Sequence, residues 1–279
     1  MNDLVIDVKN LEIETLKNLR NSKAHNTLRA YQADFKDFSA FCLKNGLNSL
    51  PTEPRIVAIY LTHLSSFSKY STLKRRLASI NVIHKLKGHY IDTKHPIISE
   101  NLMGIKRRMG IKQIAKKPLL INDLKSIINV IDEEKNEYKK YQNRALILIG
   151  FAGGFRRSEL VSIEYEDLDF VTEGVKIIVK RSKTDQTGEG MTKAIPYFDN
   201  KIYCPVLSLK NWIDFSNIKS GLVFRISDKT VALTIKKYAS LAGLDYKKYA
   251  GHSLRSGFAT STAETGADER SIMAMTGHK

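Results

Sequence analysis

The spacing of apolar residues constrains this fold more than any other feature, because it keeps a helical period along most of the chain. Between Leu28 and Cys42 apolar side chains recur every three or four residues, which indicates a helix with one buried face. Asn26, or the threonine after it, is expected to cap this helix. Further stripes follow Thr52 and Ser71, and no strand pattern competes with them. The N-terminal part therefore predicts a bundle of helices.

A second helical region begins beyond Pro118, with Asn122 as the expected cap, and strands interrupt it once. Val175–Lys180 is short and rich in β-branched residues, and residues 185–190 have the composition of a turn before another extended stretch. Helices resume near Pro205. The predicted fold class is mainly α: a helical N-terminal bundle, followed by an α+β domain of helices with a small antiparallel β-sheet or hairpin.

A basic run separates the two regions. Residues 103–117 contain no acidic side chain, and Pro118 follows them. Taken alone, such a run is a solvated face or a tail, but between two compact halves it suits a linker that wraps around a polyanion. We place the domains at residues 1–110 and 118–279, with a linker at 111–117. The basic residues are Lys106, Arg107, Arg108, Lys112, Lys116 and Lys117.

The charge balance favours a polyanionic partner. The chain has 45 Lys+Arg against 29 Asp+Glu, a formal net charge of +16, while 42% hydrophobic residues indicate a globular protein. Such an excess favours nucleic acid over an anionic membrane, although it is also compatible with a merely solvated surface. On the polar side of the helix after Ser71, phosphate contacts are predicted for Lys74, Arg75 and Arg76.

Cysteine usage and hydropathy predict a cytoplasmic protein. Cys42 and Cys204 lie far apart and in no CxxC pattern, which argues against a disulfide framework or a zinc knuckle. The N-terminus lacks a basic region leading into an apolar stretch, and the longest apolar run, residues 145–155, is too short to span a bilayer.

A glycine-permitted turn at residues 153–154 joins a buried helix to a new one and carries the first candidate functional group. An arginine at such a junction is held rigidly, and its planar fork suits a phosphate. Glu159 lies three residues after Arg156, on the same helical face, and is its predicted orienting partner. The alternative is an ordinary surface pair.

Three other segments offer cationic or imidazole groups. Strand alternation places Arg181 and Lys183 on one face at the tip of the hairpin, where lysines are often merely exposed. His252 and Arg255 have helical i, i+3 spacing and project together, a pattern that also occurs in purely structural roles. His278 adds an imidazole after the last predicted helix.

No metal or cofactor is predicted. The sequence has no HExxH, no CxxC and no cluster of acidic residues suited to two magnesium ions. A phosphoryl-transfer enzyme that uses no metal ion must neutralise the negative charge of its transition state with Arg, Lys and His side chains.

Almost the whole chain resembles the tyrosine recombinases, or phage-type integrases. SKAHNTLRAYQADFKDFSAFC resembles the start of the family's helical core-binding domain, and PRIVAIYLTHL with YSTLKRRLASINVIH resembles its continuation. FRRSEL, which contains Arg156, resembles the family's first-arginine box, and Lys183, which precedes TD, resembles the catalytic lysine of the hairpin. HSLR, which begins at His252, resembles the HxxR box, and TGH, which ends at His278, resembles the box of the last histidine. Each box is weak alone, but four in the family's order are specific together.

The resemblance implies roles for these residues. Arg156, Arg255 and His278 would hold the non-bridging oxygens of the scissile phosphate, with Glu159 supporting the first arginine. Lys183 would protonate the leaving 5′ oxygen, and His252 would assist proton transfer to and from the nucleophile.

The family's nucleophile is a tyrosine that forms a 3′-phosphotyrosyl bond, so that religation needs no ATP. The resemblance implies that this tyrosine follows the last histidine box by roughly nine residues. That position lies beyond Lys279. Tyr246 and Tyr249 precede the HxxR box, but packing or contacts with the DNA backbone explain them more simply. The chain as given is therefore expected to bind duplex DNA without cleaving it, as a truncated form or as a natural inactive relative.

Three functions remain open at this stage. The first is an integrase body whose two domains clamp a duplex at an attachment site, a monomer here and a homotetramer on DNA at full length. The second is a DNA-binding protein that occupies recombination sites without cutting them. The third is a type IB topoisomerase, which the core-binding-like N-terminal half disfavours. The target sequence, any accessory protein and the choice among phage integration, mobile-element excision and chromosome-dimer resolution stay undetermined.

Overall fold

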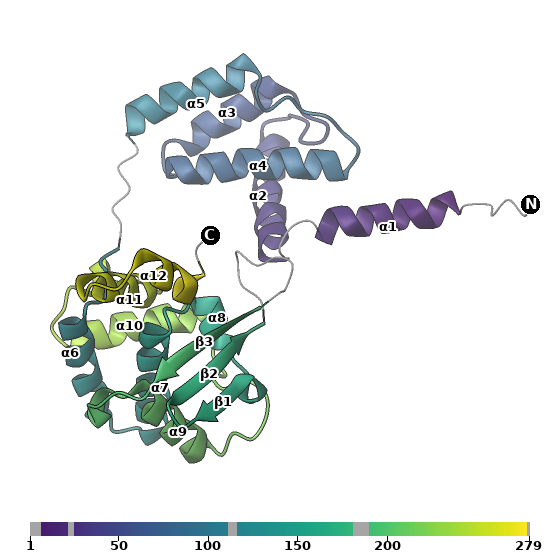
Figure 1. Ribbon diagram of the computed structural model, residues 1–279. Coiled ribbons are helices and arrows are strands. Elements are labelled where there is room, and N and C mark those ends of the chain that lie inside the picture. The colour runs from purple at the N-terminus through teal and green to yellow at the C-terminus, as the bar shows by residue number, and fades with distance from the viewer. Residues whose placement is uncertain (1–6, 22–24, 111–115, 181–189, 278–279) are drawn as a thin grey trace, which may run out of the picture. The chain divides into compact units, whose positions relative to one another are not determined.

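The computed structural model describes residues 7–21, 25–110, 116–180 and 190–277. The chain forms two compact units, residues 1–113 and 114–279, and each is described by itself (Figure 1). In the described ranges no helix combines the length and the apolar character that crossing a bilayer would require.

The first unit is helical throughout its described part. Its helices are α1 (Val8–Asn21), α2 (His25–Lys44), α3 (Pro54–Leu64), α4 (Tyr70–Leu86) and α5 (Pro96–Met109). Helix α2 packs against α4, and α3 packs against α4 and α5. The predicted stripes form the core, where Phe38, Tyr60 and Leu73 are fully or almost fully buried.

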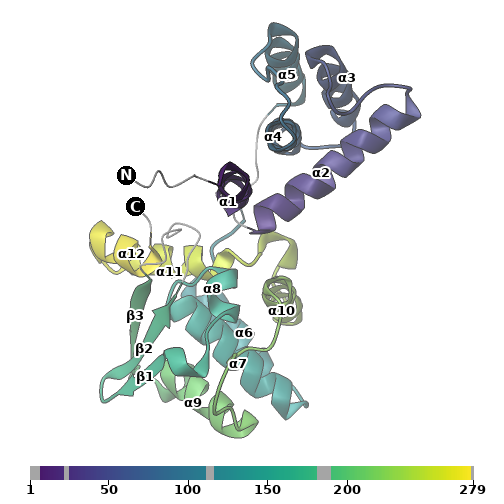
Figure 2. The ribbon, with the colours of Figure 1, turned by 90° about the vertical axis from the view of Figure 1, so that its right-hand side faces the viewer.

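The second unit surrounds the buried helix α7. Its helices are α6 (Ile121–Asp132), α7 (Glu137–Ala152), α8 (Arg157–Val161), α9 (Pro205–Ser216), α10 (Asp228–Leu241), α11 (Ser253–Glu264) and α12 (Glu269–Thr276), with short 3₁₀ turns at η1 (Tyr165–Asp167), η2 (Lys201–Tyr203) and η3 (Tyr246–Lys248). Helix α7 contacts α6, α8, α9, α10 and α11, and nearly all side chains of its second half are buried. Figure 2 shows the sheet on one side of α7 and α10 on the other. One core therefore supports the elements that carry Arg156, Glu159 and Arg255.

A three-stranded antiparallel sheet, in the order β1-β2-β3, completes this unit. Its strands are β1 (Leu168–Val171), β2 (Gly174–Val179) and β3 (Met191–Pro196). Ile177 lies opposite Lys193 and Val175 opposite Ile195, and all four side chains are buried. The inward face of β3 therefore carries a lysine among aliphatic neighbours.

The predicted fold class is confirmed: helices dominate both units, and the sheet is small and antiparallel. Three details of the sequence prediction are wrong. Helix α2 begins at His25, before the predicted cap, and α6 begins at Ile121 with Leu120 at its N-cap position. Strand β1 was not predicted, because its four residues are too few to show an alternation.

The first part of the basic run, which precedes the predicted linker at 111–117, is helical. Lys106, Arg107 and Arg108 lie in the last turn of α5, and Gly110 follows the helix as its C-cap with φ +67°. His95 and Pro96 start this helix, and cations in a last turn interact favourably with the helix dipole. These three charges are therefore held on a rigid element of the first unit.

Candidate active site

The turn between α7 and α8 fixes the first arginine of the site. Gly154 adopts φ +54°, and a Cβ added there would lie 2.8 Å from the ring of Phe258, so the turn requires glycine. Arg156 follows directly. The Glu159 carboxylate accepts hydrogen bonds from the backbone N–H of Arg156 at 2.9 Å and from its Nη1 at 2.7 Å. Only 12% of the Arg156 side chain is exposed, so its guanidinium is tightly oriented.

The second arginine approaches the same turn from α11. Arg255 is 6% exposed, and its Nη1 donates a hydrogen bond to the Gly154 carbonyl at 3.0 Å. Burial and the nearby Arg156 charge lower the pKa of Arg255 to about 10, while Glu159 opposes the shift. Helix α11 thus directs the side chain of Arg255 onto the turn that carries Arg156.

Lys193 is a third cation at this turn, and the sequence prediction missed it. Its side chain is completely buried, and its Nζ donates a hydrogen bond to the Gly153 carbonyl at 2.7 Å. Burial, Arg255 and Arg156 lower the pKa of Lys193 to about 8, and Glu159 counteracts them. The available signal was its register in β3, because alternation puts Lys193 on the inward face with Ile195.

These side chains form a cluster with excess positive charge. Arg156, Arg255 and Lys193 influence one another electrostatically, and Glu159 is the carboxylate that opposes the lowered pKa values of Arg255 and Lys193. Holding like charges together in a partly buried site is unfavourable until an anion neutralises them. The two guanidinium groups are therefore organised to bind an anionic group, because their planar forks suit a phosphate. Lys193 is completely buried and adds positive charge nearby without being exposed to a ligand.

Of the remaining predicted catalytic residues, only His252 lies within the part of the chain that the structure describes. His252 is exposed at the N-cap position of α11. The Gly277 carbonyl accepts a hydrogen bond from Arg156 Nη2 at 3.3 Å, so the chain next to His278 lies beside the first arginine. His278 itself, Lys183 and Arg181 lie outside the described residues.

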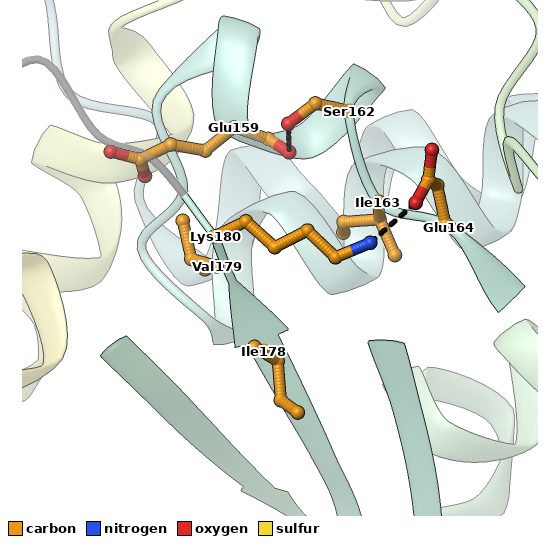
Figure 3. A pocket seen from close by; sticks show the side chains of 7 residues that line it. All are labelled: Glu159, Ser162, Ile163, Glu164, Ile178, Val179 and Lys180. Carbon is orange, nitrogen blue, oxygen red and sulfur yellow. Dashed lines mark hydrogen bonds and ion pairs between the residues drawn. The ribbon is translucent and has the colours of Figure 1, made fainter. Parts of the chain in front are cut away.

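A cavity of about 280 Å³ lies next to Glu159, between α8 and β2 (Figure 3). Lys180 crosses it to ion pairs with Glu164 and with Asp167, the latter at 2.9 Å. These two carboxylates raise the pKa of Lys180 above its usual range. Lys180 is therefore held as a structural cation, although it lies only three residues before Lys183.

Two of the predicted phosphate contacts in the first unit are engaged in ion pairs. Arg75 binds the buried carboxylate of Asp34 at 2.5 Å, and Arg76 binds Asp34 at 3.3 Å and Asp37 at 3.1 Å. Arg75 keeps 44% of its side chain exposed, and Arg76 only 19%. Lys74 is exposed. The structure thus gives Arg76 mainly a role in holding α2 against α4.

The other predicted contacts divide between the two units. Lys106, Arg107 and Arg108 are exposed on α5, and Arg108 donates a hydrogen bond to Ser65 Oγ at 2.7 Å. Lys116 is exposed, and its Nζ donates to the Lys247 carbonyl at 2.6 Å. Lys112 lies outside the described residues.

Lys117 and Tyr249 lock the start of the second unit onto the segment before α11. Tyr249 donates a hydrogen bond to Asp123 Oδ2 at 2.8 Å, and Lys117 binds the same atom at 2.9 Å. Burial, followed by the contact with Asp123, raises the pKa of the Tyr249 phenol. Gly257 of α11 lies directly against Leu119: a Cβ added at Gly257 would be 2.1 Å from the Leu119 carbonyl oxygen, so a larger residue would push the two segments apart. Tyr249 therefore has a packing role, one of the two explanations that the sequence offered, while Tyr246 is exposed.

Metal-binding clusters are not found in the described part of the chain: no three His, Cys, Asp or Glu side chains there are grouped to hold an ion.

Fold and site together define a mainly helical protein whose second unit has a cationic site suited to a phosphate. Residues 118–279 match the model of the phage integrase family. A xerD homolog from Selenomonas ruminantium, described as an integrase/recombinase, is 41% identical over 96% of this chain and 83% of its own length. The tyrosine recombinase XerC of Staphylococcus aureus (strain MSSA476) is 26% identical over 95% of this chain and 86% of its own length.

The fold is similar to that of a solved integrase. The crystal structure of lambda integrase, residues 75–356, bound to DNA matches with a TM-score of 0.63 and 17% identity, over 95% of this chain and 89% of that one. The chain therefore belongs to the phage integrase family of tyrosine recombinases.

Proposed function

We propose that this protein is the body of a site-specific DNA recombinase that cuts and rejoins DNA through a 3′-phosphotyrosyl intermediate, without metal or ATP. The observation that carries the proposal is the pair of arginines at one turn, Arg156 fixed by Glu159 and Arg255 bound to the Gly154 carbonyl. Two guanidinium groups at a single site neutralise the charge of a pentavalent phosphorus far better than one exposed arginine does.

Each residue of the family's motifs takes a role in this mechanism. Arg156, Arg255 and His278 bind the non-bridging oxygens of the scissile phosphate. Lys183 protonates the leaving 5′ oxygen, and His252 moves the proton of the nucleophile. The exposure of His252 and the ion pairs that hold Lys180 support these two assignments.

Duplex DNA is the proposed partner, bound by both units. Residues 1–110 act as the core-binding domain, residues 111–117 as a basic linker and residues 118–279 as the catalytic domain. The net charge of +16 and the exposed basic turn at the end of α5 support DNA binding, and the similar lambda integrase structure is bound to DNA. The proposed place of action is the bacterial cytoplasm, on chromosomal, phage or mobile-element DNA.

The nucleophile is proposed to follow residue 279. Among the tyrosines near the HxxR box, Tyr249 is buried and hydrogen bonded to Asp123, which makes it a poor nucleophile. We expect the 279-residue chain to bind duplex DNA but to form no covalent adduct. The measurement is incubation with nicked suicide duplexes, followed by SDS gel electrophoresis.

The matched positive control is the tyrosine-containing form, meaning the same chain continued past Lys279 through the family's tyrosine. It should give an SDS-resistant band on its attachment site. A covalent band with the 279-residue chain contradicts the assignment of the nucleophile. If neither form gives a band although both bind DNA, the protein is a non-catalytic occupant of recombination sites.

The oligomeric state is proposed to depend on the same C-terminal segment, because in this family it passes between neighbouring subunits. We expect the 279-residue chain to be a monomer in solution, and the tyrosine-containing form to assemble as a tetramer on DNA. Light scattering measures both states. A stable tetramer of the 279-residue chain without DNA would contradict this part of the proposal.

A further inference from the structure

Lys193 occupies a position at which an aliphatic residue would be expected. It lies on the inward face of β3, opposite Ile177 and two residues before the buried Ile195. Removing an ammonium group from water is costly, and burial accordingly lowers the pKa of Lys193 to about 8. A methionine or leucine would avoid this cost, so the reason for a lysine must lie in what its amine binds.

The amine joins two segments that are far apart in the sequence. Nζ donates hydrogen bonds to the carbonyl of Gly153, in the turn before Arg156, and to the carbonyl of Met275, in the last turn of α12. It also lies 4.8 Å from the centre of the Phe155 ring. The last carbonyls of a helix lack hydrogen-bond partners within the helix and carry partial negative charge. Lys193 therefore provides a hydrogen-bond donor for the Met275 carbonyl at the end of α12.

Two further contacts hold the same end of α12 on the same turn. Arg156 Nη2 donates to the Gly277 carbonyl at 3.3 Å, and Thr276 is completely buried. A Cβ added at Gly154 would lie 3.3 Å from the Thr276 methyl group, so this side chain packs directly on the turn. From the sheet, Lys193 supplies the hydrogen bonds of this contact, and Met191 also lies close, since a Cβ added at Gly277 would be 3.2 Å from its Sδ.

We propose that Lys193 is a positioning residue that fastens the C-terminal end of α12 to the Gly153–Gly154 turn, and so holds Gly277 in place beside Arg156. A neutral amine keeps two N–H donors, so loss of the proton leaves both hydrogen bonds possible. An apolar replacement removes both. The catalytic consequence rests on the proposed function, but the structural contact does not.

The first test is hydrogen exchange of the 279-residue chain, measured by mass spectrometry on the peptide that covers α12. We expect Lys193→Met to raise its exchange rate at least about tenfold, because opening of α12 then breaks fewer contacts. Ile195→Met is the matched control, since it alters the same face of β3 without removing a donor. Unchanged exchange in K193M, or equal acceleration in both variants, overturns the proposal.

Should K193M lack a cooperative unfolding transition, Lys193→Gln replaces it. Glutamine keeps two N–H donors on a shorter side chain, which does not reach both carbonyls. We expect K193Q to accelerate exchange of α12 beyond that of I195M. Exchange at the wild-type rate counts against the proposal.

The second test uses the tyrosine-containing form with saturating nicked duplex. We expect K193M to lower the rate of adduct formation by about 10²-fold with DNA affinity unchanged, because a misplacement of about 1 Å has an effect of this size. Lys193→Arg retains the donors and should recover part of the rate, while I195M stays near wild type. A wild-type rate in K193M overturns the positioning role.

The two arms separate the two proposals. Faster exchange of α12 in K193M, together with no adduct from any tyrosine-containing variant including wild type, supports the contact and contradicts the proposed function. If α12 exchanges at the wild-type rate in K193M while the tyrosine-containing wild type forms the adduct, only the proposed contact of Lys193 is contradicted.

Discussion

Replacing Arg255 by alanine in the tyrosine-containing form should lower the rate of adduct formation on a nicked duplex by at least about 10³-fold. Removing one hydrogen-bond donor to a transition-state oxyanion costs about 10²–10³-fold, and a guanidinium also removes a full charge. The low exposure of Arg255 and its hydrogen bond to Gly154 hold its fork in place, so little reorganisation is needed at the moment of reaction. The measurement is single-turnover kinetics with saturating DNA.

Arg144 offers the matched control for this substitution. It is a mostly buried arginine of the same unit, paired with Asp132 and the Ile202 carbonyl, and it lies outside the cationic cluster. Arg144→Ala should lose stability but keep the rate of adduct formation at a temperature where the variant is folded. Arg255→Lys should stay strongly impaired, because an ammonium lacks the bidentate fork. Equal rates for R255A and R144A would contradict the assignment of Arg255.

The second large effect concerns the salt dependence of DNA binding by the 279-residue chain. Changing Lys106, Arg107 and Arg108 together to alanine should reduce the slope of log K against log salt by about 2.7, which is about 0.9 for each phosphate that the variant no longer neutralises. Between 50 and 200 mM salt the wild-type affinity should therefore fall about 40-fold more than that of the triple variant. Fluorescence anisotropy with one duplex over a salt series measures both slopes.

A matched triple variant separates specific contacts from net charge. Lys135, Lys201 and Lys219 are exposed lysines of the second unit that lie in or beside loops around α6 and α9. Changing them to alanine removes the same three charges, so an equal decrease of slope in both triple variants would show that the end of α5 has no privileged contact with DNA.

The helical skeleton and the first-arginine site were predictable because both depend on local patterns. Stripes such as Leu28–Cys42 report directly which face a helix buries. The turn at residues 153–154, followed by Arg156 and Glu159, is encoded within a few residues: a glycine with positive φ, then a one-turn spacing that the carboxylate hydrogen bonds confirm.

The missed features depend on contacts between distant segments. Lys193 acquires its role only when β3, the turn at Gly153 and the end of α12 meet, and no local pattern encodes that meeting. The ion pairs of Arg75 and Arg76 with Asp34 likewise join α4 to α2. From sequence these two arginines resemble ordinary surface charges.

The most direct test of the account is a structure of the chain bound to a duplex that contains its attachment site. We predict that the guanidinium groups of Arg156 and Arg255 lie within hydrogen-bond distance, about 3 Å, of non-bridging oxygens on one and the same phosphate. Arg156 and Arg255 bound to phosphates of different nucleotides, or neither bound to DNA, would contradict it.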